Sequence, residues 1–187
     1  MNETRSKNRG FTLIELMIVV AILSILAAVA VVAYSKWIRS ARSAEAQSVL
    51  SDIRIKQEAY IASFRQYAGK SGSWDGWAPN STDPTSSAVT WSDPPAANAK
   101  EATKAWKQLG IMTSGRHFYF RYYIESGVPG TGPVKFTGRD IDSTKEFWFA
   151  ARAVQDLDDD GKCEGFEIYS QSDQIHELKP ADSKFCP

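Results

Sequence analysis

Hydrophobic residues are concentrated in one run near the start of the sequence, at residues 11–34. The only polar residues in this run before its final tyrosine are Thr12, Glu15 and Ser24. At about 1.5 Å per residue, a helix of this length crosses a hydrocarbon core of roughly 30 Å. The run therefore predicts a single membrane-spanning helix, or a segment that is removed from the mature chain.

The helical pattern continues beyond this run, because no Gly or Pro occurs between Phe11 and Ala68. Positions three or four residues apart form a stripe that is apolar or aromatic except for one glutamine: Ala46, Leu50, Ile53, Gln57, Tyr60, Phe64 and Tyr67. With Gly69 as the stop, the pattern predicts one helix over 11–68, roughly 85 Å long. Residues 11–34 are apolar on all sides and 35–68 are amphipathic, so we expect lipid or other copies of the chain to cover the first half.

The region after the helix, residues 69–116, is predicted to be a loop with a short helix at 96–109 that Gly110 ends. The first part of the loop is rich in Ser, Gly, Asp and Pro and holds Trp74, Trp77 and Trp91. These tryptophans either pack the loop against the strand-rich C-terminal part of the chain (the head) or form an exposed contact surface. The sequence leaves both interpretations open.

Strand signals fill the last region, residues 117–187. Alternating or aromatic-rich runs predict strands at 117–125, 134–137, 146–154 and 166–170. In the first run, Phe118, Phe120, Tyr122 and Ile124 share one face. We expect a four-stranded antiparallel sheet packed on the amphipathic half of the long helix, which makes the fold class α+β.

Composition and charge exclude several functions. The 187-residue chain balances 22 Lys and Arg against 22 Asp and Glu, so it has no general attraction for polyanions, and no specific nucleic-acid partner is indicated. Neither His117 nor His176 lies in a nucleophile motif, and no phosphate-binding loop is present. The sequence therefore predicts a protein that is not an enzyme and requires no cofactor.

An acidic segment in the last region matches a calcium-loop pattern. The pattern D-x-[DN]-x-[DN]-G-x5-E is met by Asp156, Asp158, Asp160, Gly161 and Glu167. Further ligands would be the backbone carbonyl of Lys162 and the carboxylate of Glu164. Because the flanking segments read as strands, the alternative is a solvated hairpin tip on an Asp-Gly turn. A structural Ca²⁺ site is the sharper hypothesis, and the pattern alone does not decide between the two.

The N-terminus has two competing interpretations. One is an ordinary secretory signal with small residues at Ala28 and Ala30 before a cut. However, the acid at Glu15 is unusual for that class, and no breaker separates the run from the helix that follows. The basic leader ending in Gly10, followed by Phe11-Thr12-Leu13-Ile14-Glu15-Leu16, resembles instead the prepilin signature of type IV pilins and of the pseudopilins of type II secretion.

This resemblance implies a type IV pilin fold and a sequence of processing and assembly steps. Residues 1–10 would be a leader that a prepilin peptidase removes between Gly10 and Phe11, and the new amine of Phe11 would be methylated. The subunit would first sit in the inner membrane by its single span. Pilus assembly machinery would then pack its helix with those of other copies into a surface filament for adhesion, motility or uptake. The alternatives are a pseudopilin, or a secreted binding domain with an ordinary signal.

The resemblance also offers a role for the acid in the apolar run. Cleavage creates a cation at Phe11, and Glu15 lies about 6 Å farther along the helix. Opposite charges in a low-dielectric bundle favour pairing, so Glu15 would pair with the N-terminal amine of a neighbouring subunit. The alternative is a Glu15 side chain that is solvated near the membrane surface.

The two cysteines, Cys163 and Cys186, complete the expected sites. A head on the outer side of the inner membrane lies in an oxidising compartment, which favours a disulfide between them. This pair resembles the C-terminal disulfide that ties the tail of type IV pilins to the sheet. Closing that loop would stabilise the head by roughly 3 kcal/mol.

Overall fold

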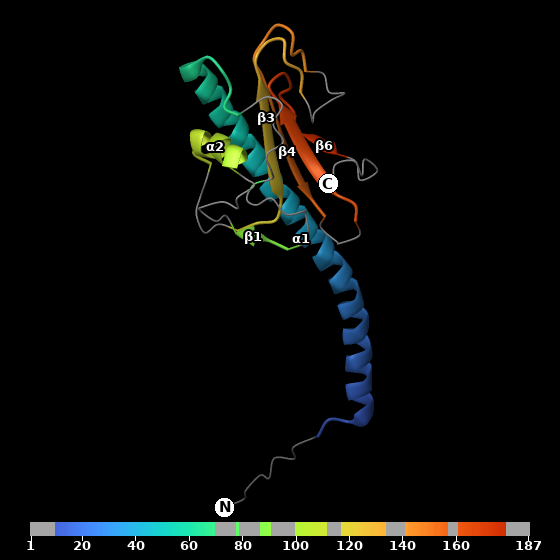
Figure 1. The fold of residues 1–187 in the computed structure, drawn as a ribbon. Coiled ribbons are helices and arrows are strands. Elements are labelled where there is room, and N and C mark those ends of the chain that lie inside the picture. Colours follow the sequence, from blue (N-terminus) through green and yellow to red (C-terminus); the bar gives the residue numbers. More distant parts are fainter. Residues whose placement is uncertain are drawn as a thin grey trace, which may run out of the picture. The chain divides into compact units, whose positions relative to one another are not determined.

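The computed structural model describes residues 10–69, 78, 87–90, 100–111, 117–133, 141–156 and 161–178. By its internal contacts the chain divides into two units, Met1–Ser40 and Ala41–Pro187. Along the chain the elements are α1 (Leu13–Phe64), β1 (Val89–Thr90), α2 (Lys100–Leu109), β2 (His117–Phe118), β3 (Arg121–Gly127), β4 (Trp148–Gln155), β5 (Glu164–Tyr169) and β6 (His176–Leu178) (Figure 1).

In the first unit, helix α1 is largely apolar between Leu13 and Tyr34, and every residue of that part is exposed. By length and composition it is able to cross a membrane, and none of its most apolar window is buried within the chain. Two serine hydroxyls in this part bond within the helix: Ser24 Oγ donates to the Val20 carbonyl at 2.7 Å, and Ser35 Oγ to the Val32 carbonyl at 3.0 Å. Polar groups satisfied in this way suit a surrounding without water.

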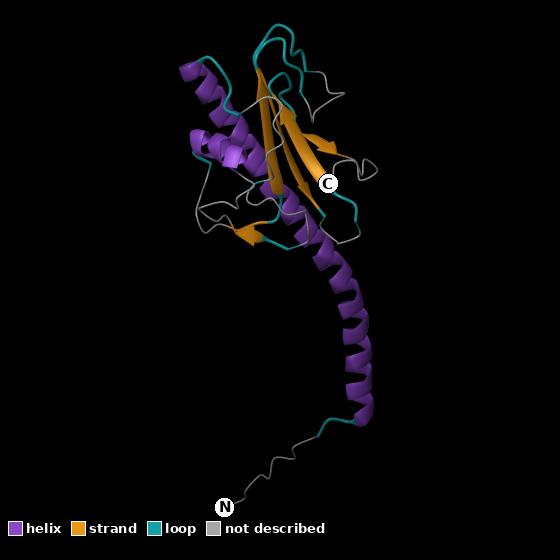
Figure 2. Ribbon diagram, viewed as in Figure 1, coloured by secondary structure: helices purple, strands orange, loops and turns teal. Residues whose placement is uncertain are grey.

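In the second unit, the remaining part of α1 lies across one face of an antiparallel sheet in the order β3-β4-β5-β6 (Figure 2). The registers pair Tyr123 with Arg152 and Arg152 with Glu167. The prediction of a long helix on a four-stranded antiparallel sheet is confirmed, and the arrangement is consistent with the type IV pilin fold.

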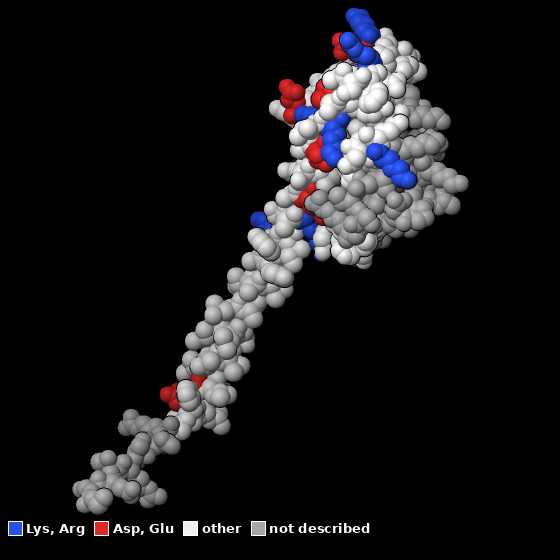
Figure 3. Space-filling view, turned by 90° about the vertical axis from the view of Figure 1, so that its left-hand side faces the viewer, with Lys and Arg blue, Asp and Glu red and all other residues white. Residues whose placement is uncertain are grey.

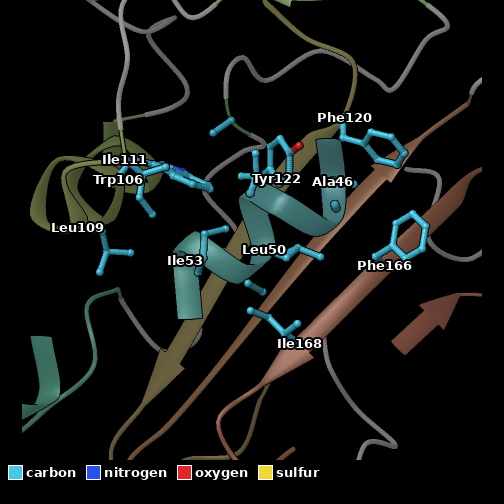
Figure 4. Packing of buried hydrophobic residues seen from close by; sticks show 14 of the residues in the cluster. Ala46, Leu50, Ile53, Trp106, Leu109, Ile111, Phe120, Tyr122, Phe166 and Ile168 are labelled. Atoms are coloured by element: carbon cyan, nitrogen blue, oxygen red, sulfur yellow. The ribbon is translucent and has the colours of Figure 1, made fainter. Parts of the chain in front are cut away.

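The core fills the space between α1 and the sheet (Figure 4). Ala46, Leu50 and Ile53 from α1 are fully buried, as the stripe predicts. They belong to one cluster with side chains from β3, β5 and helix α2, among them Tyr122, Ile168 and Trp106. A second cluster, including Tyr123, Ala150, Val154 and Leu178, covers the other face, so β4 is buried at every position.

The end of α1 differs from the prediction. The helix ends at Phe64 rather than near Ala68, because Arg65 takes a left-handed conformation with φ of 58°. The chain then turns back, and the fully buried amide of Gln57 bonds both backbone groups of Ala68, at 2.8 Å to its carbonyl and 2.9 Å from its N–H. The single glutamine in the stripe thus provides hydrogen-bond partners for the backbone N–H and carbonyl of Ala68, where the chain turns back.

The predicted strand 117–125 is wrong as one continuous element. It is split into β2, which pairs with β1, and β3, which pairs with β4, with Tyr119 and Phe120 outside both. The cause is Glu45 on α1, whose carboxylate accepts the backbone N–H of Tyr119 at 3.1 Å and so takes a donor that a strand would use. The predicted apolar face survives, because Phe118, Phe120 and Tyr122 all lie in the core cluster.

The other elements lie close to their predicted positions. The strands predicted at 146–154 and 166–170 appear as β4 and β5, but the latter is not the last strand, because β6 follows it. The short helix begins by Lys100 and ends before Gly110, whose φ is 62°. The predicted strand 134–137, the first residues of the short-helix prediction (96–99) and the tryptophans Trp74, Trp77 and Trp91 lie outside the described residues.

Candidate functional site

The predicted processing point lies immediately before helix α1. Gly10 and Phe11 are both outside the helix, and Phe11 is 82% exposed. No atom lies within 4 Å of the position that a Cβ on Gly10 would occupy. The peptide bond between the two residues is thus non-helical and unobstructed by described parts of the chain, as a peptidase substrate requires.

Glu15 lies in a capping box at the start of α1. Its Oε2 accepts the backbone N–H of Thr12 at 2.9 Å and the Thr12 hydroxyl at 2.7 Å, while the Glu15 N–H donates back to that hydroxyl at 3.3 Å. Such reciprocal bonds satisfy donors that a helix start leaves unpaired. The sequence analysis missed this capping role of Glu15, although Thr-x-x-Glu before an apolar run is the pattern that predicts a capping box. Neither bond to the carboxylate uses Oε1.

The acidic turn between β4 and β5 is described only at its two ends. Asp156 is 7% exposed, and its Oδ2 accepts the Gly161 N–H at 2.9 Å. Gly161 has φ of 79°, the bend that the calcium pattern assigns to glycine. Asp158 and Asp160 lie outside the described residues, and within the described ranges no group of three metal-binding side chains comes together.

The remaining predicted calcium ligands lie on the strand side of the turn. Lys162 is exposed, and Glu164 opens β5 opposite Gln155. Glu167 is fully buried three residues inside that strand, where its Oε2 accepts bonds from Arg152 Nε at 3.2 Å and Nη2 at 3.0 Å. This pairing argues against Glu167 as the bidentate ligand, because one oxygen of the buried carboxylate is already bonded to Arg152.

The cysteines are described only in part. Cys163 is 6% exposed and belongs to the cluster on the outer face of the sheet. Cys186 lies outside the described residues, so the pairing between the two stays a prediction.

The two histidines have structural surroundings. His117 Nδ1 and the Thr90 hydroxyl lie 2.9 Å apart across the β1–β2 pair. The His176 ring stacks on Tyr169 with 5.0 Å between ring centroids, and its Nε2 lies 2.8 Å from the Ser172 hydroxyl. The described neighbours form no arrangement of nucleophile, base and orienting acid around either ring.

A polar contact between helix and sheet was not predicted. Glu45 accepts both the Tyr119 N–H and, at 3.1 Å, the Tyr122 hydroxyl. One turn earlier, the Arg42 guanidinium lies 4.2 Å from the centroid of the Tyr119 ring. Lys56 Nζ donates to the Gly110 carbonyl at 2.7 Å, where α2 ends. Such side-chain contacts to distant loops carry no local sequence signal, so residue patterns alone do not reveal them.

Comparison with known proteins identifies the N-terminal region. Residues 5–31 match the model of the prokaryotic N-terminal methylation motif, a range that begins within the predicted leader, crosses the predicted cleavage point and includes the first part of α1. No curated protein and no solved structure gave a match. Proteins with this motif are pilin-like or pseudopilin precursors, a structural class that is anchored in the membrane before it polymerises. The chain carries the signature of type IV prepilin-like proteins.

Proposed function

We propose that this protein is a structural subunit of a type IV pilus. A prepilin peptidase would cut between Gly10 and Phe11, methylate the new amine, and release a subunit that the inner membrane holds by α1 until assembly. The observation that carries the proposal is the methylation motif at residues 5–31 on a helix that the chain itself leaves uncovered. Adhesion, motility or uptake would follow from the filament.

The geometry at Glu15 supports a role in assembly besides the capping box. Because both capping bonds use Oε2, Oε1 is directed to neither of them. The same carboxylate would close its own helix start through one oxygen and meet the Phe11 amine of a neighbouring subunit through the other. A carboxylate has lone pairs enough for both tasks.

Mass spectrometry of the mature N-terminus tests the proposal. A chain that begins at N-methylated Phe11 is the expected result. A chain that begins at Val31 would mean that the apolar run is a discarded signal, and the protein would then be a secreted binding domain.

A pseudopilin of type II secretion is the second candidate, since the motif is common to both classes. Deletion of the gene separates them. Loss of surface filaments with normal secretion favours a pilin, whereas loss of protein secretion with unchanged filaments favours a pseudopilin.

Two features of the head are proposed to be structural. The Asp156–Gly161 bend fits a Ca²⁺ loop, with Glu164 rather than Glu167 as its last carboxylate. At a Ca²⁺ concentration 100 times the dissociation constant, binding would stabilise the folded head by about 2.7 kcal/mol, which chelator-dependent unfolding measures. A Cys163–Cys186 disulfide would tie the chain end to β5, and peptide mapping without reductant tests that link.

A further inference from the structure

A group of aromatic and cationic side chains lies on α1 where the apolar run ends. Its members are Tyr34, Lys36, Trp37 and Arg39, which we call the collar, and all four are exposed. The two large rings, Tyr34 and Trp37, are 64% and 68% exposed. Trp and Tyr are enriched where a membrane protein passes from lipid to water, and Lys and Arg extend their charged ends to the same level. The composition of the collar is therefore typical of a membrane surface.

The length of the uncharged run places the collar at such a surface. Residues 16–35 are 20 residues without a charge. At about 1.5 Å per residue they span about 30 Å, which is the thickness of a hydrocarbon core. When Glu15 lies at one surface of the membrane, the collar therefore lies at the other.

The collar surrounds the helix instead of marking one side of it. Successive residues of a helix are about 100° apart, so Tyr34 and Trp37 are separated by about 60°, and so are Lys36 and Arg39. The middle of the aromatic pair is about 160° from the middle of the cationic pair. A single protein partner contacts one side of a helix, whereas lipid contacts all sides. The arrangement therefore fits lipid better than a single protein partner.

The local charge favours a lipid that is anionic. Residues 16–44 contain Lys36, Arg39 and Arg42 but no Asp or Glu, a net charge of 3 − 0 = +3, although the whole chain is neutral. Cations usually gather on the cytoplasmic side of a membrane span, so the bias that sets topology does not explain cations on the side of the head. Anionic headgroups, in contrast, attract Lys and Arg that lie close to a membrane surface.

We propose that the collar binds anionic phospholipid headgroups in the leaflet on the side of the head and so fixes the depth of the unassembled subunit. The inference rests on the proposed precursor that the membrane holds before assembly. Lys36 and Arg39 would meet the lipid phosphates, and the rings of Tyr34 and Trp37 would lie just below them. A zwitterionic lipid satisfies the rings but leaves the positive charge without an excess of negative charge.

Quenching of Trp37 fluorescence by brominated lipids tests the proposal. The full chain is inserted into vesicles of phosphatidylcholine with a minority of phosphatidylglycerol. The same mole fraction of lipid carries bromine in each sample, either as phosphatidylglycerol or as phosphatidylcholine. The difference between wild type and Trp37→Phe isolates the signal of Trp37. We expect the lipid beside Trp37 to be enriched in phosphatidylglycerol by at least about threefold.

Two double variants with the same loss of charge show where the enrichment arises. Lys36→Gln with Arg39→Gln keeps both rings and should reduce the enrichment to about onefold, because the local cations are gone. The matched control is Arg65→Gln with Lys145→Gln, which removes two cations from exposed positions in the head. This control should keep the enrichment of the wild type.

The outcomes separate this proposal from the pilin function. Equal quenching by the two brominated lipids in wild type overturns the lipid preference without any variant. Quenching that survives in full in Trp37→Phe, or an enrichment that both double variants lose, overturns its assignment to the collar. None of these results affects the pilin function, which fails instead if the mature chain begins at Val31.

Discussion

The two halves of helix α1 have the same backbone conformation, but only the second half is buried against the rest of the chain. In the second unit, Ala46, Leu50 and Ile53 are fully buried against the sheet. In the first unit, Leu23 and Val32 remain 57% and 70% exposed, although they are at least as apolar. Because exposed apolar surface costs about 25 cal/mol per Å², the first half needs cover from outside the chain.

Each of the two units also holds an acid in apolar surroundings, and the two acids are stabilised differently. Glu167 in the sheet is paired with Arg152 of the same chain. Glu15 has only Thr12 as its partner among the described residues, and it is the only charged residue in the apolar segment, residues 11–34. On the face that Figure 3 shows, most of the charged side chains lie on the head and few lie along the helix. The head carries its counter-charge within itself, whereas the apolar segment would receive one at assembly.

The largest expected effect is on assembly and comes from Glu15→Gln. Glutamine serves the capping box as well as glutamate does, so the helix start and the head should be unchanged. It cannot pair as an anion with a neighbour's amine, so filament yield, measured by electron microscopy and shearing, should fall by at least tenfold. Thr12→Val is the control that weakens the cap and keeps the charge. Normal filaments from Glu15→Gln would show that capping is the only role of this acid.

In the head, removal of the cation that faces the buried acid is expected to be nearly as damaging. Arg152→Met takes two donors from the fully buried Glu167 and should lower the free energy of unfolding by about 3–5 kcal/mol. Denaturant unfolding of the full chain in detergent measures this change. The double variant Arg152→Met, Glu167→Met should recover much of the loss, since the buried charge goes too. A single variant within 1 kcal/mol of wild type would contradict the importance of the pair.

Truncation of one leucine in each half tests the contrast in burial directly. Leu50→Ala leaves a cavity between α1 and the sheet and should cost the head about 2–5 kcal/mol (Figure 4). Leu23→Ala removes the same atoms from an exposed position and should leave head unfolding unchanged. Tryptophan fluorescence during unfolding reports on both, because Trp106 and Trp148 are buried in the head. Equal losses would mean that the first half of α1 is also part of the cooperative core.

The sequence predicted the features that rest on periodicity. The stripe through Ala46, Leu50 and Ile53 and the aromatic run around Tyr122 located the helix face and the sheet that pack together. The strand β6 was missed because three residues are too few to show alternation. The split at Tyr119 was missed because its cause, Glu45, lies 74 residues earlier in the chain.

Candidate sites followed the same rule. The methylation motif is local and was read correctly, and the Thr12–Glu15 box was equally local but overlooked. Glu167 fitted the calcium pattern by spacing alone, and only the register of β4 with β5 shows that it faces Arg152 instead. Patterns of spacing do not report which partner a side chain meets across a sheet.

The end of α1 gives the smallest predicted effect and a matched pair of variants to measure it. Arg65 and Gly110 end α1 and α2 in the same left-handed conformation, with φ of 58° and 62°. Arg65→Gly removes a strain of roughly 1–2 kcal/mol but loosens the unfolded chain, so we expect a net stabilisation of about 0.5–1 kcal/mol.

Gly110→Ala should do the reverse by about 1 kcal/mol, through backbone strain alone, because a Cβ there meets no atom within 4 Å. The expected result is that the midpoints of thermal unfolding of the two variants move in opposite directions. This would show that the backbone conformation at Arg65 and the Gln57 bonds to Ala68 set the end of α1, and that Gly69 does not. Destabilisation by Arg65→Gly would instead mean that the arginine side chain contributes more to this turn than its backbone costs.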